Sequence, residues 1–175
     1  MLGDCWEYDI RSSVTAFKLG FAKDALIACG SVEHPRNVFI ASYRYLEGKK
    51  EFVNDICYEV FNADDSPARE LQKEIIKQAI TAIGFGANAR GYGWKNKDGS
   101  WSNPSLFSII KDEAARKKFL ELEVVKRLID EQALLDEFIL RVFRQEFPEV
   151  WSSHVVSAAI LNGLKVAGKD LKKVK

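Results

Sequence analysis

The sequence has few of the residues that mark disulfide-rich, zinc-binding or membrane-spanning proteins. Among 175 residues there are three cysteines, two histidines and four prolines. Cys5, Cys29 and Cys57 are far apart and odd in number, and no Cys/His spacing predicts a zinc site, so we expect buried, reduced thiols. No run approaches the roughly 18 consecutive apolar residues of a membrane-spanning helix. We therefore expect no membrane span.

The charge balance excludes further classes. The formal net charge is +1, so overall charge does not predict nucleic-acid binding, which would have to come from a local patch. Lysines gather in a basic tail at 165–175, which is typical of a solvated chain end. The first ten residues are acidic and lack the basic start of a signal peptide. We expect a cytoplasmic protein, in the host cytoplasm if a phage encodes it.

The hydrophobic periodicity predicts a mainly α-helical fold of the α+β class. Residues 5–10 alternate and are rich in aromatic and β-prone types, which predicts one short strand. Asp98-Gly99 predicts the turn of a small hairpin near 91–101. Helical spacing, capping residues and first-turn prolines predict helices over 12–28, 38–46, 51–61, 66–83, 105–147 (in one or two pieces) and 149–164.

The stretch KEIIKQAITAIGFGANARGYGW, residues 73–94, begins as an amphipathic helix and ends in glycines alternating with aromatics. One side of the helix is apolar and is expected to face a core; it consists of Leu71, Ile75, Ala79, Ile80 and Ile83. Spacings of three and four place a second set on another side; it consists of Lys73, Lys77, Thr81, Gly84 and Phe85. Lysines, a hydroxyl and a ring on one surface suit a nucleoside triphosphate. The alternative is a solvated helix face and an ordinary helix end.

The spacing Lys73-x3-Lys77-x7-Phe85-Gly86 resembles the fingers-helix motif of the family A DNA polymerases and of the single-subunit RNA polymerases of phages and mitochondria. That motif reads Arg-x3-Lys-x7-Tyr-Gly, so Lys77 and Gly86 match, Phe85 replaces the tyrosine and Lys73 replaces the arginine. Arg90 is similar to a basic residue that follows the glycine in the phage enzymes. The resemblance is most specific over 73–86.

A second similarity lies upstream, in EYDIRSSVTAF. Asp9 ends the expected strand and Ser12-Ser13 opens a helix, which resembles the metal-binding aspartate at the end of a polymerase palm strand. The resemblance implies that Asp9 is one of two carboxylates that bridge two magnesium ions, which activate the 3′-hydroxyl and stabilise the leaving pyrophosphate.

The same resemblance implies roles for the lysine helix and for the loop after it. Lys77 would contact the triphosphate and protonate the leaving group, and Lys73 would be a second phosphate contact. The remaining expected contacts to nucleotide are Thr81, Phe85 and Gly86. We expect Arg90 to contact nucleic-acid phosphate, and Tyr92 and Trp94 to be stacking platforms for its bases. The implied partners are a nucleic-acid template and nucleoside triphosphates, with no membrane.

One part of the family pattern is missing, because no second metal-binding aspartate motif follows Gly86. We therefore expect a palm–fingers piece of a larger polymerase chain, a nucleotidyltransferase fragment that is inactive alone. Its regions would be a palm-like strand and helix at 1–30, a helical fingers-like region at 31–164 and the basic tail at 165–175, in one compact unit.

Two alternatives stay open at this point. The first is a non-enzymatic helical module that binds nucleic acid without magnesium, using lysines and aromatics between 73 and 97 as phosphate contacts and stacking platforms. The second is a protein-interaction module, which predicts an exposed apolar stripe along Leu120, Val124, Leu128, Leu135 and Ile139.

Overall fold

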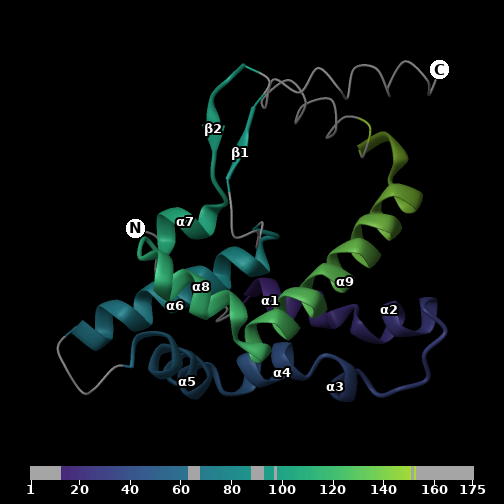
Figure 1. Ribbon diagram of the computed structural model, residues 1–175. Coiled ribbons are helices and arrows are strands. Elements are labelled where there is room, and N and C mark those ends of the chain that lie inside the picture. Colours follow the sequence, from purple (N-terminus) through teal and green to yellow (C-terminus); the bar gives the residue numbers. More distant parts are fainter. Residues whose placement is uncertain (1–12, 63–67, 88–92, 97, 151, 153–175) are drawn as a thin grey trace, which may run out of the picture. The chain divides into compact units, whose positions relative to one another are not determined.

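The computed structural model describes residues 13–62, 68–87, 93–96, 98–150 and 152, and this part of the chain is mostly helical (Figure 1). The helices are α1 (Ser13–Gly20), α2 (Ala22–Ala28), α3 (Pro35–Val38), α4 (Ile40–Glu47), α5 (Lys49–Phe61), α6 (Ala68–Gly84), α7 (Ser105–Ile109), α8 (Glu113–Glu121) and α9 (Glu123–Glu146). The chain divides into two units, Met1–Asp136 and Glu137–Lys175, so the last part of α9 belongs to the second unit.

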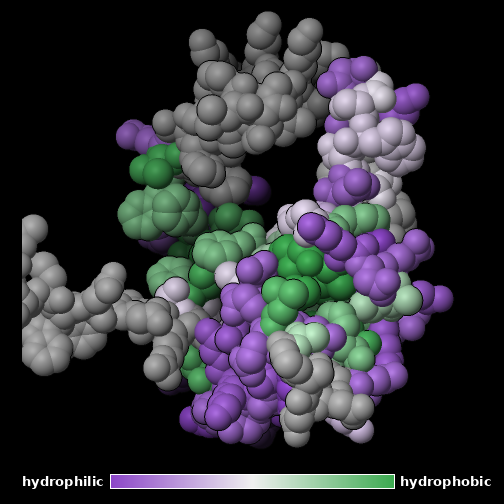
Figure 2. All heavy atoms as spheres, turned by 90° about the vertical axis from the view of Figure 1, so that its left-hand side faces the viewer, coloured by the Kyte–Doolittle hydropathy of each residue, from purple (hydrophilic) through white to green (hydrophobic). Residues whose placement is uncertain are grey.

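Helix α5 packs against three other helices of the first unit, α4, α6 and α8 (Figure 1). It buries Phe52, Val53, Ile56, Cys57 and Val60, which follow the spacing of one helical face. Fully burying a side chain of this size contributes about 2–3 kcal/mol to stability. Hydrophilic side chains cover much of the surface outside this core, with hydrophobic ones between them (Figure 2).

The region 105–147 contains three helices, so the prediction of one or two pieces is wrong. Asp112 begins α8, because its carboxylate accepts a hydrogen bond of 2.6 Å from the Ala115 amide. Leu122 has an extended backbone, with φ −61° and ψ 128°, and separates α8 from α9. Neither break is accompanied by a proline or glycine, which are the residues that mark helix ends most clearly in a sequence.

Helix α4 is capped by a residue far away in the sequence. Its N-cap residue Phe39 provides no side-chain hydrogen bond. Instead the carboxylate of Glu131, on α9, accepts hydrogen bonds from the amides of Ala41 (3.0 Å) and Ser42 (2.8 Å). Arg127 donates to the same carboxylate at 3.1 Å. The first amides of a helix have no hydrogen-bond acceptor within the helix, and the Glu131 carboxylate supplies one. Its negative charge also complements the positive end of the helix dipole.

Two short strands lie near the range 91–101, where a small hairpin is predicted. Trp94–Lys95 (β1) pairs antiparallel with Trp101–Ser102 (β2). Gly99 has φ +87° and its amide donates to the Asn96 carbonyl at 3.1 Å. The strand predicted at 5–10, the basic tail and residues 153–164 of the last predicted helix lie outside the described residues. None of the helices described above is long and apolar enough to cross a membrane.

Candidate nucleotide-binding face of helix α6

Helix α6 carries the lysines of the predicted site, and its predicted apolar face is confirmed at Ala79, Ile80 and Ile83, with Ile75 packed against the core. The core side consists of Ile76, Ala79, Ile80 and Ile83, with Gly84 at the end of the helix. Leu71, which was predicted to face the core, is 68% exposed. On a helical wheel Ile76 and Ile83 lie together near the middle of the buried side, whereas Leu71 lies well round toward solvent. The apolar pattern therefore predicted the period and most of the buried face, but it included Leu71 and missed Ile76.

The predicted nucleotide-binding residues do not share a single face, because the row they form turns around the helix. Each step of four residues advances about 40° beyond a full turn. The side chain of Lys73 is only 18% exposed, that of Lys77 is 44% exposed, and Phe85 is 73% exposed. Thr81 is also exposed. The row therefore begins at the edge of the core and ends in solvent, so Lys77, Thr81 and Phe85 form its accessible part.

Lys73 lies on the side of α6 that faces α5. Burial raises the pKa of the Cys57 thiol on α5, and the positive charges of Arg69 and Lys73 lower it by smaller amounts. This charge effect and the low exposure of Lys73 indicate that it lies near α5, at the edge of the core.

Both lysines have acidic partners one turn earlier in the same helix. Lys73 Nζ lies 2.7 Å from a Glu70 carboxylate oxygen, and Lys77 Nζ lies 3.4 Å from one of Glu74. The hydrogen bond from Lys73, followed by its charge, lowers the pKa of Glu70. Pairs at this spacing are ordinary on helix surfaces. The face that would meet a triphosphate therefore carries carboxylates as well as ammonium groups.

The glycines at the end of α6 have a local structural role. Gly86 has φ +76°, its amide donates to the Ile83 carbonyl at 2.9 Å, and the Ala87 amide donates to the Ala82 carbonyl at 2.9 Å. This pair of bonds defines a Schellman motif, in which a left-handed glycine satisfies the last carbonyls of a helix. The Gly-Phe-Gly step thus ends α6 and leaves Phe85 projecting into solvent at its last turn.

A buried lysine that was not predicted fixes this end of α6. Lys18, on α1, is 6% exposed; its Nζ donates to the Gly84 carbonyl at 2.5 Å and lies 2.6 Å from an Asp136 carboxylate oxygen. A side chain at Gly84 would have Val14 as its neighbour, so this glycine faces α1 and not the solvent as predicted. No local sequence motif predicts that Lys18 binds the Gly84 carbonyl or that Glu131 caps α4. Each contact joins elements that are far apart in the sequence.

Several predicted site residues cannot be placed. Asp9, Arg90 and Tyr92 lie outside the described residues, and of Trp94 only the backbone, in β1, is described. Within the described ranges no group of three or more His, Cys, Asp or Glu side chains could hold a metal ion. The residues that are placed therefore provide no magnesium site.

The prediction that an interaction module would expose an apolar stripe between Leu120 and Ile139 is wrong. Leu128 is 1% exposed and Leu135 is 0% exposed, because this side of α9 packs into the core. Among the described residues of the second unit, the exposed large apolar side chains are Leu140, Phe143, Phe147 and Val150. The rings of Phe143 and Phe147 lie 5.2 Å apart.

The fold and this face define a mostly helical protein whose candidate site is the accessible side of one helix. Comparisons with protein-family models, with curated proteins and with solved structures find no match. The case for a function therefore depends on the residues and geometry of this chain and on the motif resemblance.

Proposed function

We propose that this chain is part of a template-dependent nucleotidyltransferase, in which α6 is the helix that faces the incoming nucleotide. The observation that carries the proposal is the accessible row of Lys77, Thr81 and Phe85 along α6. An ammonium group, a hydroxyl and an aromatic ring at these steps provide a phosphate contact, a hydrogen-bond donor and a stacking surface. In this proposal Lys73 contributes positive charge from the edge of the row.

The acidic partners of the lysines set a condition for phosphate binding. A triphosphate must replace the carboxylates of Glu70 and Glu74 as the partner of the two ammonium groups. Exposed ion pairs of this kind contribute only about 0–1 kcal/mol, so the exchange costs little. A polyphosphate carries more charge than a single carboxylate and competes for Lys77 directly.

The remaining parts of the proposal depend on residues outside the described ranges. In a polymerase of this kind Asp9 would hold magnesium at the end of a palm strand, and Arg90, Tyr92 and Trp94 would contact the nucleic acid. Two bridging magnesium ions need more than one carboxylate, and the described residues supply no such set. We therefore propose a binding role for this chain in a larger polymerase, in the cytoplasm, and no catalysis by the chain alone.

The proposal is tested by nucleotide binding to the full chain. Lys77→Ala should weaken the binding of a fluorescent ATP analogue by at least about tenfold, since a charge-assisted contact to phosphate contributes roughly 1.5–3 kcal/mol. Glu74→Gln should have the opposite effect and tighten binding, because it leaves Lys77 free for phosphate. Fluorescence anisotropy measures both, and circular dichroism verifies that each variant remains folded.

The matched control is Lys117→Ala. Lys117 also lies on an exposed helix surface and is paired with a glutamate, Glu121, at 3.9 Å. Unchanged binding in this control, with opposite changes at positions 77 and 74, supports the nucleotide face. Equal affinities in all four proteins would disprove it. Binding of single-stranded oligonucleotide but not of the ATP analogue, with or without magnesium, would instead select the non-enzymatic nucleic-acid module.

A further inference from the structure

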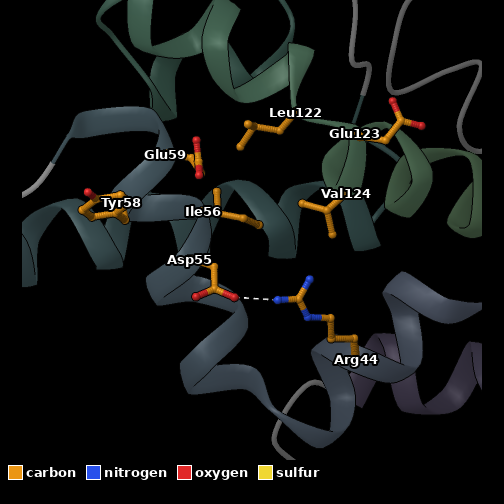
Figure 3. A pocket seen from close by; sticks show the side chains of 8 residues that line it. All are labelled: Arg44, Asp55, Ile56, Tyr58, Glu59, Leu122, Glu123 and Val124. Carbon is orange, nitrogen blue, oxygen red and sulfur yellow. Dashed lines mark hydrogen bonds and ion pairs between the residues drawn. The ribbon is translucent and has the colours of Figure 1, made fainter.

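A groove of about 360 Å³ lies between α5 and the junction of α8 with α9, and none of its lining residues belongs to α6 (Figure 3). The residues that line it are Arg44, Asp55, Ile56, Tyr58, Glu59, Leu122, Glu123 and Val124. It forms because the extended backbone at Leu122 separates two helices over the surface of α5. Its volume is within the range of small-ligand sites in proteins.

The middle of the groove is apolar. Ile56 is 1% exposed and forms part of the core, while Leu122 and Val124 are half-buried and pack against that core. Figure 3 shows Ile56 and Leu122 pointing toward one another, with Val124 beside them. Tyr58, 61% exposed, lies at one edge. A ligand with an aliphatic portion would remove this surface from water.

The charges around the apolar middle are mainly negative. One guanidinium, that of Arg44, and three carboxylates, those of Asp55, Glu59 and Glu123, are among the lining groups. Arg44 lies 2.5 Å from Asp55 and over the ring of Phe52, so its charge is already compensated. Among the described residues, Glu59 and Glu123 have no ion-pair partner. Glu59 lies next to Ile56 and Leu122 in Figure 3, so an uncompensated carboxylate borders the apolar surface.

We propose that this groove binds a basic, apolar segment of a partner protein through a lysine or arginine side chain. The aliphatic stem of such a side chain covers Ile56, Leu122 and Val124, while its cationic end reaches Glu59. The Tyr58 ring at the edge offers a further contact to the cation. The carboxylates repel phosphates, so the groove has the opposite charge preference from the lysine face of α6. A free polyamine could pair with the Glu59 carboxylate. Unlike a peptide, the polyamine has no apolar side chains beside its cationic group to cover the rest of the groove.

The test uses the full chain and a labelled peptide of alternating leucine and lysine. We expect this peptide to bind, with an affinity that falls as salt is raised. Matched peptides with norleucine or glutamate in place of lysine should bind much more weakly. Equal binding of the norleucine peptide would overturn the proposal, because the carboxylates would then play no part. Displacement of the peptide by spermidine at equal concentration would overturn it too, in favour of a free organic cation.

Two variants with opposite expected effects tie the binding to this groove. Glu59→Gln should weaken peptide binding about fivefold, as expected for one exposed charge interaction. Arg44→Met keeps an unbranched side chain but removes the charge and leaves Asp55 uncompensated, so it should tighten binding. Glu113→Gln, an exposed glutamate of α8 outside the groove, is the control and should bind as the unmodified chain does. Identical changes in Glu59→Gln and Glu113→Gln would overturn the assignment to the groove.

Discussion

Charged side chains have different roles at the N-terminus of α4 and on the outer side of α6. At α4 the carboxylate of Glu131, 6% exposed, accepts bonds from two amides that lie some 90 positions away in the sequence. On α6 the carboxylates of Glu70 and Glu74 pair with lysines three residues along the same helix. The first contact joins two helices, whereas the second joins neighbours within one helix.

This difference separates charges that stabilise the fold from charges that are available for binding. A buried carboxylate with several donors cannot be exchanged for a ligand without leaving amides unsatisfied, which costs several kcal/mol. An exposed pair within one helix contributes a few tenths of a kcal/mol and exchanges easily. Lys77 is therefore suited to meet a ligand, and Glu131 is not.

The largest effect is expected at Glu131. Glu131→Ala should lower the free energy of unfolding by about 3 kcal/mol, because the amides of Ala41 and Ser42 are buried and would lose their acceptor. Glu131→Gln, which keeps one acceptor oxygen, should cost about half as much. Urea denaturation followed by circular dichroism measures both variants.

The control for this prediction is Glu121→Ala, at an exposed glutamate paired with Lys117. It should change the free energy of unfolding by less than about 0.5 kcal/mol. A similar loss in Glu121→Ala and Glu131→Ala would remove the distinction between the two regions.

An intermediate effect is expected at the glycines that end α6. Gly86→Ala should cost about 1 kcal/mol, since φ is +76° and an L-residue is strained there. Gly84→Ala should be neutral or stabilise by about 0.5 kcal/mol, because the added methyl group would meet only Val14, at 3.6 Å, and alanine favours the helix. Thermal unfolding of the two variants measures the difference. A loss at position 84 as large as that at 86 would contradict the Schellman geometry.

The smallest effect concerns the pH dependence of the Glu70–Lys73 pair. The pKa of Glu70 is lowered in the folded chain, so the pair stabilises the protein above the ordinary glutamate pKa of about 4.3. This contribution is lost as the pH falls through the lowered pKa. Glu70→Gln should therefore be slightly less stable than the unmodified chain at pH 7 and equal to it near pH 2. Unfolding midpoints of both proteins between pH 2 and pH 7 measure this difference in stability. A difference that grows as the pH falls would contradict the pairing.

Helix positions could be predicted largely from the sequence, because period and capping are local properties. The predicted range 51–61 corresponds to α5 (Lys49–Phe61), and the predicted end of the lysine helix near 83 corresponds to the end of α6 at Gly84. The breaks at Asp112 and Leu122 were not predicted, since the contacts that stabilise short helices come from packing.

The candidate site was predictable in composition but not in arrangement. The spacing that relates Lys73, Lys77 and Phe85 is a property of the sequence. It did not reveal that Lys73 lies at the edge of the core, that both lysines have glutamate partners, or that Lys18 reaches Gly84. Whether magnesium and nucleotide bind stays a prediction.

The sequence by itself determined that the described chain is mostly helical and that α6 ends in a glycine turn, because backbone conformation and helical period depend on neighbouring residues. Only the tertiary structure decided that Lys73 lies at the edge of the core, which carboxylate caps α4, and where the groove beside Leu122 lies. Each of these depends on side chains brought together from distant positions, and a long-range contact leaves no local pattern in the sequence.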